Sequence, residues 1–206
     1  MKKFVPKWSK FSGTKYDNST SAYVINLKRR SDRLLQFKEN CPLLHVNVFE
    51  AYDGQILRNN TSLKNGELGC AYSHYDLWKL CSTLNRPLVV FEDDAQIRDK
   101  FNEIFSTLEK NNFYDINSIL FLGGGPRGFG NYKKKIYNDL VSVKISCIHW
   151  LRCECYIIFP DFASQLVRDY NFNCPIDLFI NKYNNLYMLH SEISYPGNSN
   201  NDSDTS

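Results

Sequence analysis

The chain has 206 residues, of which 43% are hydrophobic and 23% are charged, and its formal net charge is +3. This composition is typical of a folded globular chain and excludes a fully disordered protein. The small charge argues against a nucleic-acid partner, and no apolar run approaches the about 18 residues that a membrane span requires.

One domain is expected over residues 21–197. Residues 1–20 are expected to form a loosely attached lead, and residues 198–206 a polar tail. No secretion signal is recognised, because Trp8 and its polar neighbours interrupt the apolar run that a signal peptide needs. Without such a signal, a cytoplasmic location is expected.

Two local patterns receive ordinary structural interpretations. Seven cysteines, an odd number, favour reduced thiols over a disulfide framework. Cys153 and Cys155 are interpreted as core residues, because no second Cys/His pair stands at zinc-ligand spacing. The longest basic run, Lys133-Lys134-Lys135, is interpreted as a solvated loop.

The predicted elements alternate between strands and helices. Short apolar or alternating runs predict strands at 22–27, 45–49, 88–91, 116–122 and 155–159. Helical spacing predicts helices at 31–38, 66–84 and 161–170. Ser31 and Asp161 are expected as N-caps, and Arg86-Pro87 ends the second helix. Strands separated by helix-length segments predict an α/β fold with a mostly parallel sheet, in which ligands bind beyond the carboxyl ends of the strands.

An acidic triplet follows the buried strand predicted at 88–91. Glu92, Asp93 and Asp94 would repel one another there unless a cation neutralises them, and oxygen ligands suit Mg²⁺ or Mn²⁺. In extended geometry Glu92 and Asp94 point the same way and can share one ion. The alternative is an acidic surface turn.

A glycine-containing segment, 65–74, opens the second predicted helix. Gly66 and Gly69 would let another backbone or a ligand approach closely, and the helix N-terminus favours an anion. Glu67 and His74 fall on one stripe of this helix. A purely structural role for His74 remains an alternative.

Arginines cluster in segment 26–33, just after the first predicted strand. Arg29, Arg30 and Arg33 can bind phosphate oxygens in bidentate fashion. Cations at a helix start oppose the helix dipole, so they indicate either an anionic ligand or a solvated basic helix start.

Together these segments resemble glycosyltransferase family 25, which includes bacterial lipooligosaccharide galactosyltransferases and collagen hydroxylysine galactosyltransferases. The resemblance covers about residues 22–196 in the family's order. Its specificity comes from combining Gly-Glu-Leu-Gly-Cys, Ser-His and Glu-Asp-Asp. The matching segments are Val24-Ile25-Asn26-Leu27 with Arg30 and Arg33, Ala51-Tyr52-Asp53-Gly54, residues 66–74 with Trp78, residues 89–94, residues 155–158 and residues 175–179.

The resemblance implies a GT-A fold and an inverting, Mn²⁺- or Mg²⁺-dependent hexosyltransferase. The donor would be a UDP-sugar carrying galactose or glucose. The acceptor would be a hydroxyl group on a glycan, a lipid-linked sugar or a collagen-like hydroxylysine. Relatives that lack signals and retention tails are compact bacterial or viral proteins, which suggests a similar origin.

The resemblance also implies a set of site residues. The metal ligands would be Glu92, Asp94 and His190. The general base would be Asp177, Glu154 or Asp93. Asp177 is preferred because it follows Cys174-Pro175 at a probable helix start, although an N-cap would explain it equally well. The donor site would include Asn26, Arg30, Arg33, Asp53, Gly66, Glu67, Gly69 and His74.

Two other functions compete with this one. The first is a non-catalytic family member that acts as a binding or interaction protein, although three retained carboxylates argue against a decayed site. The second is a metal-dependent phosphohydrolase, which would need further Asp or His ligands. Cys153-Glu154 stands where the family has small or different residues, which leaves the acceptor side open.

Overall fold

The structure, a computed structural model, describes residues 21–41, 46–97, 101, 118–123, 132–137, 140–145, 152–183, 186–189 and 194–196. The predicted lead and tail, and His190, lie outside the described residues. Among the described helices, none combines the length and the apolar character that crossing a membrane would require.

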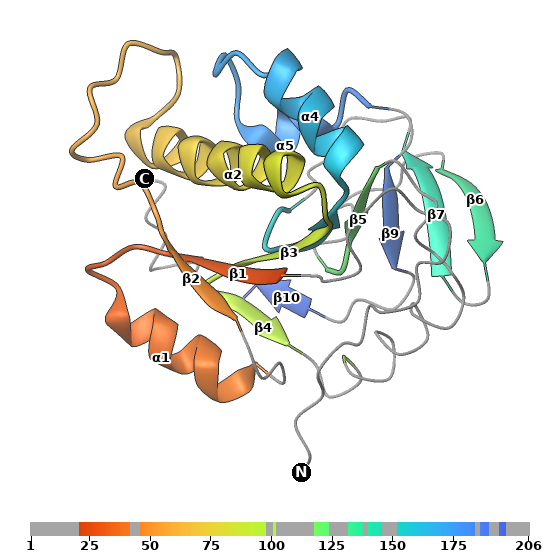
Figure 1. Cartoon of the computed structure of the whole chain (residues 1–206), viewed down its shortest axis with the longest axis horizontal. Helices are drawn as coiled ribbons and strands as arrows, with labels where there is room; N and C mark the ends of the chain where they lie inside the picture. Colours follow the sequence, from red (N-terminus) through yellow and green to blue (C-terminus); the bar gives the residue numbers. More distant parts are fainter. Residues whose placement is uncertain are drawn as a thin grey trace.

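An eight-stranded sheet forms the centre of the chain (Figure 1). In spatial order the strands are β2 (Asn47–Glu50), β1 (Ser21–Asn26), β3 (Leu88–Glu92), β8 (Cys155–Ile158), β5 (Ile119–Phe121), β9 (Tyr187–Leu189), β7 (Leu140–Ile145) and β6 (Tyr132–Tyr137). Strand β1 is parallel to β2 and β3, β8 is antiparallel to β3 and β5, and β9 is parallel to β5. Because β7 is antiparallel to β9 and β6 to β7, β8 and β7 are the two strands of this sheet that oppose the common direction.

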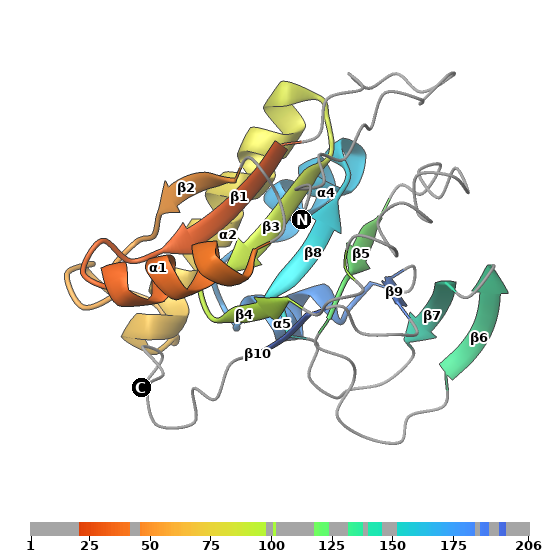
Figure 2. The same ribbon diagram turned by 90° about the horizontal axis from the view of Figure 1, so that it is seen from below.

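Helices cover both faces of this sheet. Helices α2 (Asn65–Leu84) and α4 (Pro160–Asp169) pack together on one face, and α1 (Ser31–Asn40) lies on the other (Figures 1 and 2). Short strands β4 (Ala95–Ile97) and β10 (Ser194–Pro196) form a separate antiparallel pair. A mostly parallel sheet flanked by helices confirms the predicted α/β class.

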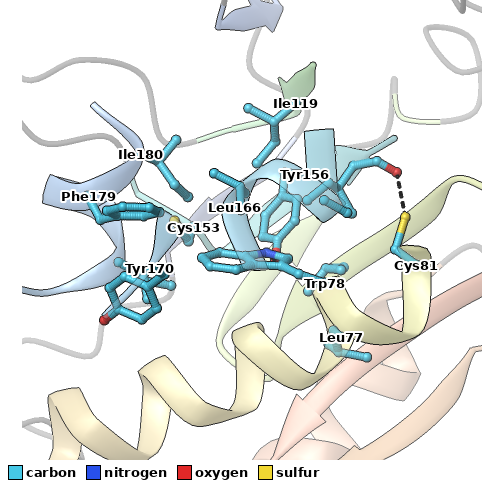
Figure 3. Packing of buried hydrophobic residues seen from close by; sticks show 14 of the residues in the cluster. Leu77, Trp78, Cys81, Ile119, Cys153, Tyr156, Leu166, Tyr170, Phe179 and Ile180 are labelled. Atoms are coloured by element: carbon cyan, nitrogen blue, oxygen red, sulfur yellow. Dashed lines mark hydrogen bonds between the residues drawn. The ribbon is translucent and has the colours of Figure 1, made fainter. Parts of the chain in front are cut away.

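Side-chain alternation along the strands divides the core into two layers. On β3, Leu88 and Val90 face the layer under α2 and α4, whereas Val89 and Phe91 face the layer under α1. Figure 3 shows the first layer, where Trp78 of α2 packs among residues of α4 and β8. Continuing this alternation by one residue directs Glu92 toward α2.

The predicted helices and strands are largely confirmed, but details at their ends differ. Both N-cap predictions are wrong. Arg30 is the N-cap of α1, so Ser31 is already its first helical residue. Pro160 opens α4 because its fixed φ angle suits a first helical position, and this leaves Asp161 inside the first turn.

Two further findings concern the basic run and the cysteines. The basic run Lys133-Lys134-Lys135 lies in β6 rather than in a loop, because β6 pairs along its length with β7. Cys153 and Cys155 are buried core residues, as predicted, and the six cysteines of the described residues are free.

Candidate functional site

The candidate site lies where β1 and β3 end. These parallel strands are in register, with Ile25 opposite Glu92, so the segments that follow them meet at one edge of the sheet. Strand β8 runs in the opposite direction, and therefore the residues that precede it arrive at the same edge. The backbone N–H of Glu92 donates to the carbonyl of Glu154 at 2.9 Å.

An open cleft of about 740 Å³, its mouth included, covers this edge. Helix α2, the loop after β2 and the turn after β3 contribute side chains to it. The predicted site residues that line the cleft are Arg33, Asp53, Gly66, His74, Glu92, Asp93 and Asp94.

Asp93, in the acidic turn after β3, accepts hydrogen bonds from side chains of both β1 and α1. Asn26 Nδ2 donates to its Oδ2 at 2.6 Å, and Arg33 Nη1 donates to its Oδ1 at 3.2 Å. Burial raises the pKa of Asp93, and these two donors oppose that shift. Because both carboxylate oxygens already accept hydrogen bonds, Asp93 is poorly placed to act as a base.

His74 connects the core to the cleft through a chain of hydrogen bonds. Trp78 Nε1 lies 3.1 Å from the Tyr156 hydroxyl, which lies 2.8 Å from His74 Nδ1. His74 Nε2 lies 3.1 Å from Glu92 Oε1. Burial lowers the pKa of His74 to about 3, so the ring is neutral.

An indole N–H can only donate, so the Tyr156 oxygen accepts from Trp78. Because this oxygen can also accept a second hydrogen bond, Trp78 alone does not select the His74 tautomer. When Glu92 is ionised, its carboxylate can only accept, so His74 carries its proton on Nε2 and its Nδ1 accepts from the Tyr156 hydroxyl. In that state the neutral ring holds the Glu92 carboxylate toward the cleft.

Three acids of the site keep their protons to higher pH than such groups usually do. Burial is the main cause, and it raises the pKa of Glu92 to about 7, of Asp94 to about 6 and of Glu154 to about 8. The negative charges also act on one another, while Arg33 and Arg152 oppose the shifts of Glu92 and Asp94. The site therefore gathers more negative charge than its arginines compensate.

Several oxygens of these acids have no hydrogen-bond partner among the described residues. They are Oδ1 of Asp94 and both carboxylate oxygens of Glu154, all buried. Buried polar atoms normally have a hydrogen-bond partner, so these oxygens indicate a partner that is not one of the described residues. Carboxylate oxygens are the ligands that a hard divalent cation such as Mg²⁺ or Mn²⁺ prefers, and such a cation would fit here.

Four predicted donor residues have protein contacts of their own. Arg30 forms an ion pair with Asp32 at 2.9 Å. Asp53 accepts from Arg29 Nε at 2.8 Å, and this guanidinium lowers the pKa of Asp53. Glu67 accepts from the backbone N–H that begins α2, as a helix cap does.

The fourth, Gly69, is required by packing rather than by a ligand. A Cβ at this position would lie 2.4 Å from the Tyr52 carbonyl oxygen and 2.8 Å from the Gly54 nitrogen. The loop that lines the cleft therefore rests directly on the α2 backbone. This is the close backbone approach that the two glycines predict.

Asp177 lies in the first turn of α5 (Ile176–Ile180), whose N-cap is Pro175. The N-cap explanation of Asp177 is therefore wrong, although its Oδ1 accepts from the Leu178 backbone N–H at 2.9 Å. Burial raises the pKa of Asp177, and its charge in turn raises the pKa of Glu92. Asp177 is not among the residues that line the cleft, although its charge acts on Glu92.

Sequence reasoning missed three contributors to the site. The sequence indicates only that Tyr156 is a strand residue, and its hydroxyl contacts His74 because β8 packs against α2. Arg152 precedes a strand whose reversed direction is not evident from sequence. Cys70 lines the cleft, and its spacing of four from His74 is the signal that could have identified it.

The fold and site define an α/β domain with buried acids gathered at the edge of a mostly parallel sheet. Comparison with known families then identifies it more narrowly. The family described as "Glycosyltransferase family 25 (LPS biosynthesis protein)" matches residues 19–180. The chain belongs to glycosyltransferase family 25.

Individual relatives agree with this assignment. "Procollagen galactosyltransferase 2" of Homo sapiens is 31% identical over 187 residues, which cover 77% of this chain and 29% of that protein. "Procollagen lysyl hydroxylase and glycosyltransferase" of Acanthamoeba polyphaga mimivirus is 31% identical over 135 residues, or 50% of this chain and 15% of that protein. The chain thus spans less than a third of either relative.

A solved structure that the comparison matches to this chain is a "Putative Glucose-1-Phosphate Thymidylyltransferase from Bacillus anthracis". Its TM-score is 0.45 and its sequence identity 8%, over 86% of this chain and 89% of that one.

Proposed function

We propose that the chain is a metal-dependent, inverting hexosyltransferase. It would transfer galactose or glucose from a UDP-sugar to a hydroxyl group of an acceptor. The observation that carries this proposal is the group of buried acids without hydrogen-bond partners, Asp94 and Glu154, beside Glu92 at the edge of the cleft.

Glu92 and Asp94 are the proposed ligands of Mn²⁺ or Mg²⁺. Both line the cleft, and an oxygen-ligated divalent ion would neutralise the departing nucleoside diphosphate. Arg33 adds a cation at the cleft wall, and Gly66 brings the N-terminal end of α2 to it. A helix N-terminus and a guanidinium both favour phosphate oxygens.

Asp177 is the proposed general base, which would take the proton of the acceptor hydroxyl. Its raised pKa brings its proton affinity closer to neutrality, as base catalysis requires. Glu154 is the alternative, since its carboxylate has no hydrogen-bond partner among the described residues. Asp93 is the least suitable, because Asn26 and Arg33 hold both of its oxygens.

The acceptor is proposed from the names of the relatives. Two of them carry "Procollagen" in their names, which supports a hydroxyl of a collagen-like hydroxylysine. A glycan or a lipid-linked sugar are the other acceptors that the family resemblance implies.

A non-catalytic binding role is the second candidate. "Probable inactive glycosyltransferase 25 family member 3" of Bos taurus is 29% identical over 101 residues, which cover 38% of this chain and 17% of that protein. The intact acidic triplet favours catalysis, because acids that raise one another's pKa values are costly to keep without a cation.

Calorimetric titration with UDP, with and without Mn²⁺, tests the donor site. Wild type should bind UDP in a metal-dependent manner, and Asp94→Ala should lose this binding. Asp169→Ala is the matched control, because Asp169 lies exposed at the end of α4. Absence of UDP binding in wild type under both conditions would overturn the transferase proposal.

Turnover of a UDP-sugar tests the base. Asp177→Asn should lower kcat by about 10²–10⁴-fold while leaving UDP affinity nearly unchanged, because a base acts in the transition state. Glu154→Gln is compared in parallel. A larger kcat loss in Glu154→Gln than in Asp177→Asn would reassign the base to Glu154.

A further inference from the structure

The cleft contains a second set of potential metal ligands with different chemistry. The Cys70 thiol, a ring nitrogen of His74 and a carboxylate oxygen of Glu92 all lie within 4.8 Å of one another. We propose that these three side chains form a binding site for a thiophilic divalent cation of the Zn²⁺ class. The site goes beyond the proposed transferase function and does not depend on it.

The fold brings these ligands together for simple reasons. Cys70 and His74 are four residues apart on α2, so they lie on one face of the helix. Glu92 ends β3 on the side that faces α2. The His74 Nε2 to Glu92 Oε1 distance is 3.1 Å, close to the roughly 3.3 Å that separates two ligands of a tetrahedral Zn²⁺ ion.

The Cys70 sulfur distinguishes this site from the proposed Mn²⁺ or Mg²⁺ site at Glu92 and Asp94, which we call the hard-ion site. Mn²⁺ and Mg²⁺ prefer oxygen, whereas a thiolate with an imidazole and a carboxylate is a ligand set for Zn²⁺ or Co²⁺. All three side chains line the cleft. A tetrahedral ion held by them would therefore keep its fourth position open toward the cleft, where water or a ligand oxygen completes it.

Tyr156 supplies the second-shell contact that a ligating histidine needs. To bind the ion through Nε2, the His74 ring must carry its proton on Nδ1 instead, and this N–H then donates to the Tyr156 oxygen. The ring stays neutral throughout. The Cys70 thiol gives its proton to solvent as the metal–sulfur bond forms, so one proton is released per ion when Glu92 is already ionised.

Titration with Co²⁺ tests the site directly, because a cobalt–thiolate bond produces an ultraviolet charge-transfer absorption that oxygen and nitrogen ligands do not. Wild type should develop this absorption, and Cys70→Ser should lose it. Cys153→Ser is the matched control, as Cys153 is also a buried cysteine near the site. Asp94→Ala should retain the absorption, since Asp94 belongs only to the hard-ion site.

Competition with a chromophoric chelator then measures Zn²⁺ affinity. Cys70→Ser should weaken it by more than about 100-fold, and Tyr156→Phe by about 10–100-fold, the usual cost of removing an outer-shell partner. The proposal is overturned if wild type shows no thiolate absorption, or if the absorption survives in Cys70→Ser. Glu92 is a ligand in both proposals, but the readouts differ: thiolate absorption reports only on the site at Cys70, and Mn²⁺-dependent UDP binding only on the transferase proposal.

Discussion

At the scale of single residues, the Tyr156 hydroxyl connects the core to the cleft. It accepts from Trp78 and donates to His74, and both bonds are buried. A strand residue thereby supports the tautomer in which a helical histidine donates to Glu92. No sequence motif would connect Glu92 with position 156.

Tyr156→Phe is expected to destabilise the fold by about 1–3 kcal/mol, because it leaves Trp78 Nε1 and His74 Nδ1 buried without a partner. Chemical denaturation measures the loss. Tyr183→Phe is the control, since its hydroxyl bonds to Asp169 at the surface and its loss should stay within about 0.5 kcal/mol. Equal losses of stability in the two variants would show that the buried hydrogen bonds of Tyr156 stabilise the fold no more than a surface hydrogen bond does.

At the scale of elements, the contact between α2 and the loop after β2 shapes the cleft. Gly69 allows the loop carbonyl of Tyr52 to approach the helix, and Ser73 Oγ accepts from the Tyr52 backbone N–H at 3.0 Å. The Ser73 hydroxyl in turn donates to the Gly69 carbonyl at 2.7 Å. The motif around Gly69 therefore fixes a loop as well as a helix start.

Gly69→Ala separates helix propensity from packing. Alanine favours a helix over glycine by about 1 kcal/mol, but here its Cβ would overlap backbone atoms of Tyr52 and Gly54. We expect a net destabilisation of about 1–3 kcal/mol and weaker UDP binding, because the loop must move. Thr83→Ala, on the exposed part of α2, should change stability by less than about 0.5 kcal/mol. A stabilised Gly69→Ala would disprove the close contact.

The elements that the sequence predicts best are those whose pattern is local. Continuous apolar runs identified β3 and β8, and helical spacing identified α2. The β6–β7 hairpin was missed because the lysines of β6 indicate a loop, and only pairing between the strands reveals a sheet.

The site residues also fall into those that local sequence patterns predict and those that depend on the assembled sheet. Glu92 and Asp94 follow a buried strand, and His74 lies on one stripe of a helix with Glu67, so these local signals are sufficient to select them. The contributions of Tyr156 and Arg152 depend on β8 running antiparallel to β3, which brings its first residues to the edge where β3 ends. Strand direction is a property of the assembled sheet, and no spacing along the chain reports it.

At the scale of the whole molecule, the gathered acids couple stability to pH. The folded form keeps Glu92, Asp94 and Glu154 protonated to higher pH than the unfolded chain does. Unfolding therefore releases protons, and the free energy of unfolding falls as pH rises through the raised pKa values. His74 acts oppositely, because its lowered pKa costs stability only below about pH 6.5.

The window from about pH 6.5 to 8.5 consequently isolates the acids. Without metal, Glu154 alone, with its pKa of about 8, should account for a loss of about 2 kcal/mol across this window, or about 4–8 °C in Tm. Glu154→Gln should flatten the dependence, since an amide does not titrate. Mn²⁺ should raise Tm more at pH 8.5 than at 6.5, because it binds the ionised carboxylates. A metal-free Tm that rises with pH over this window would contradict the assignment of these acids to one buried, uncompensated cluster.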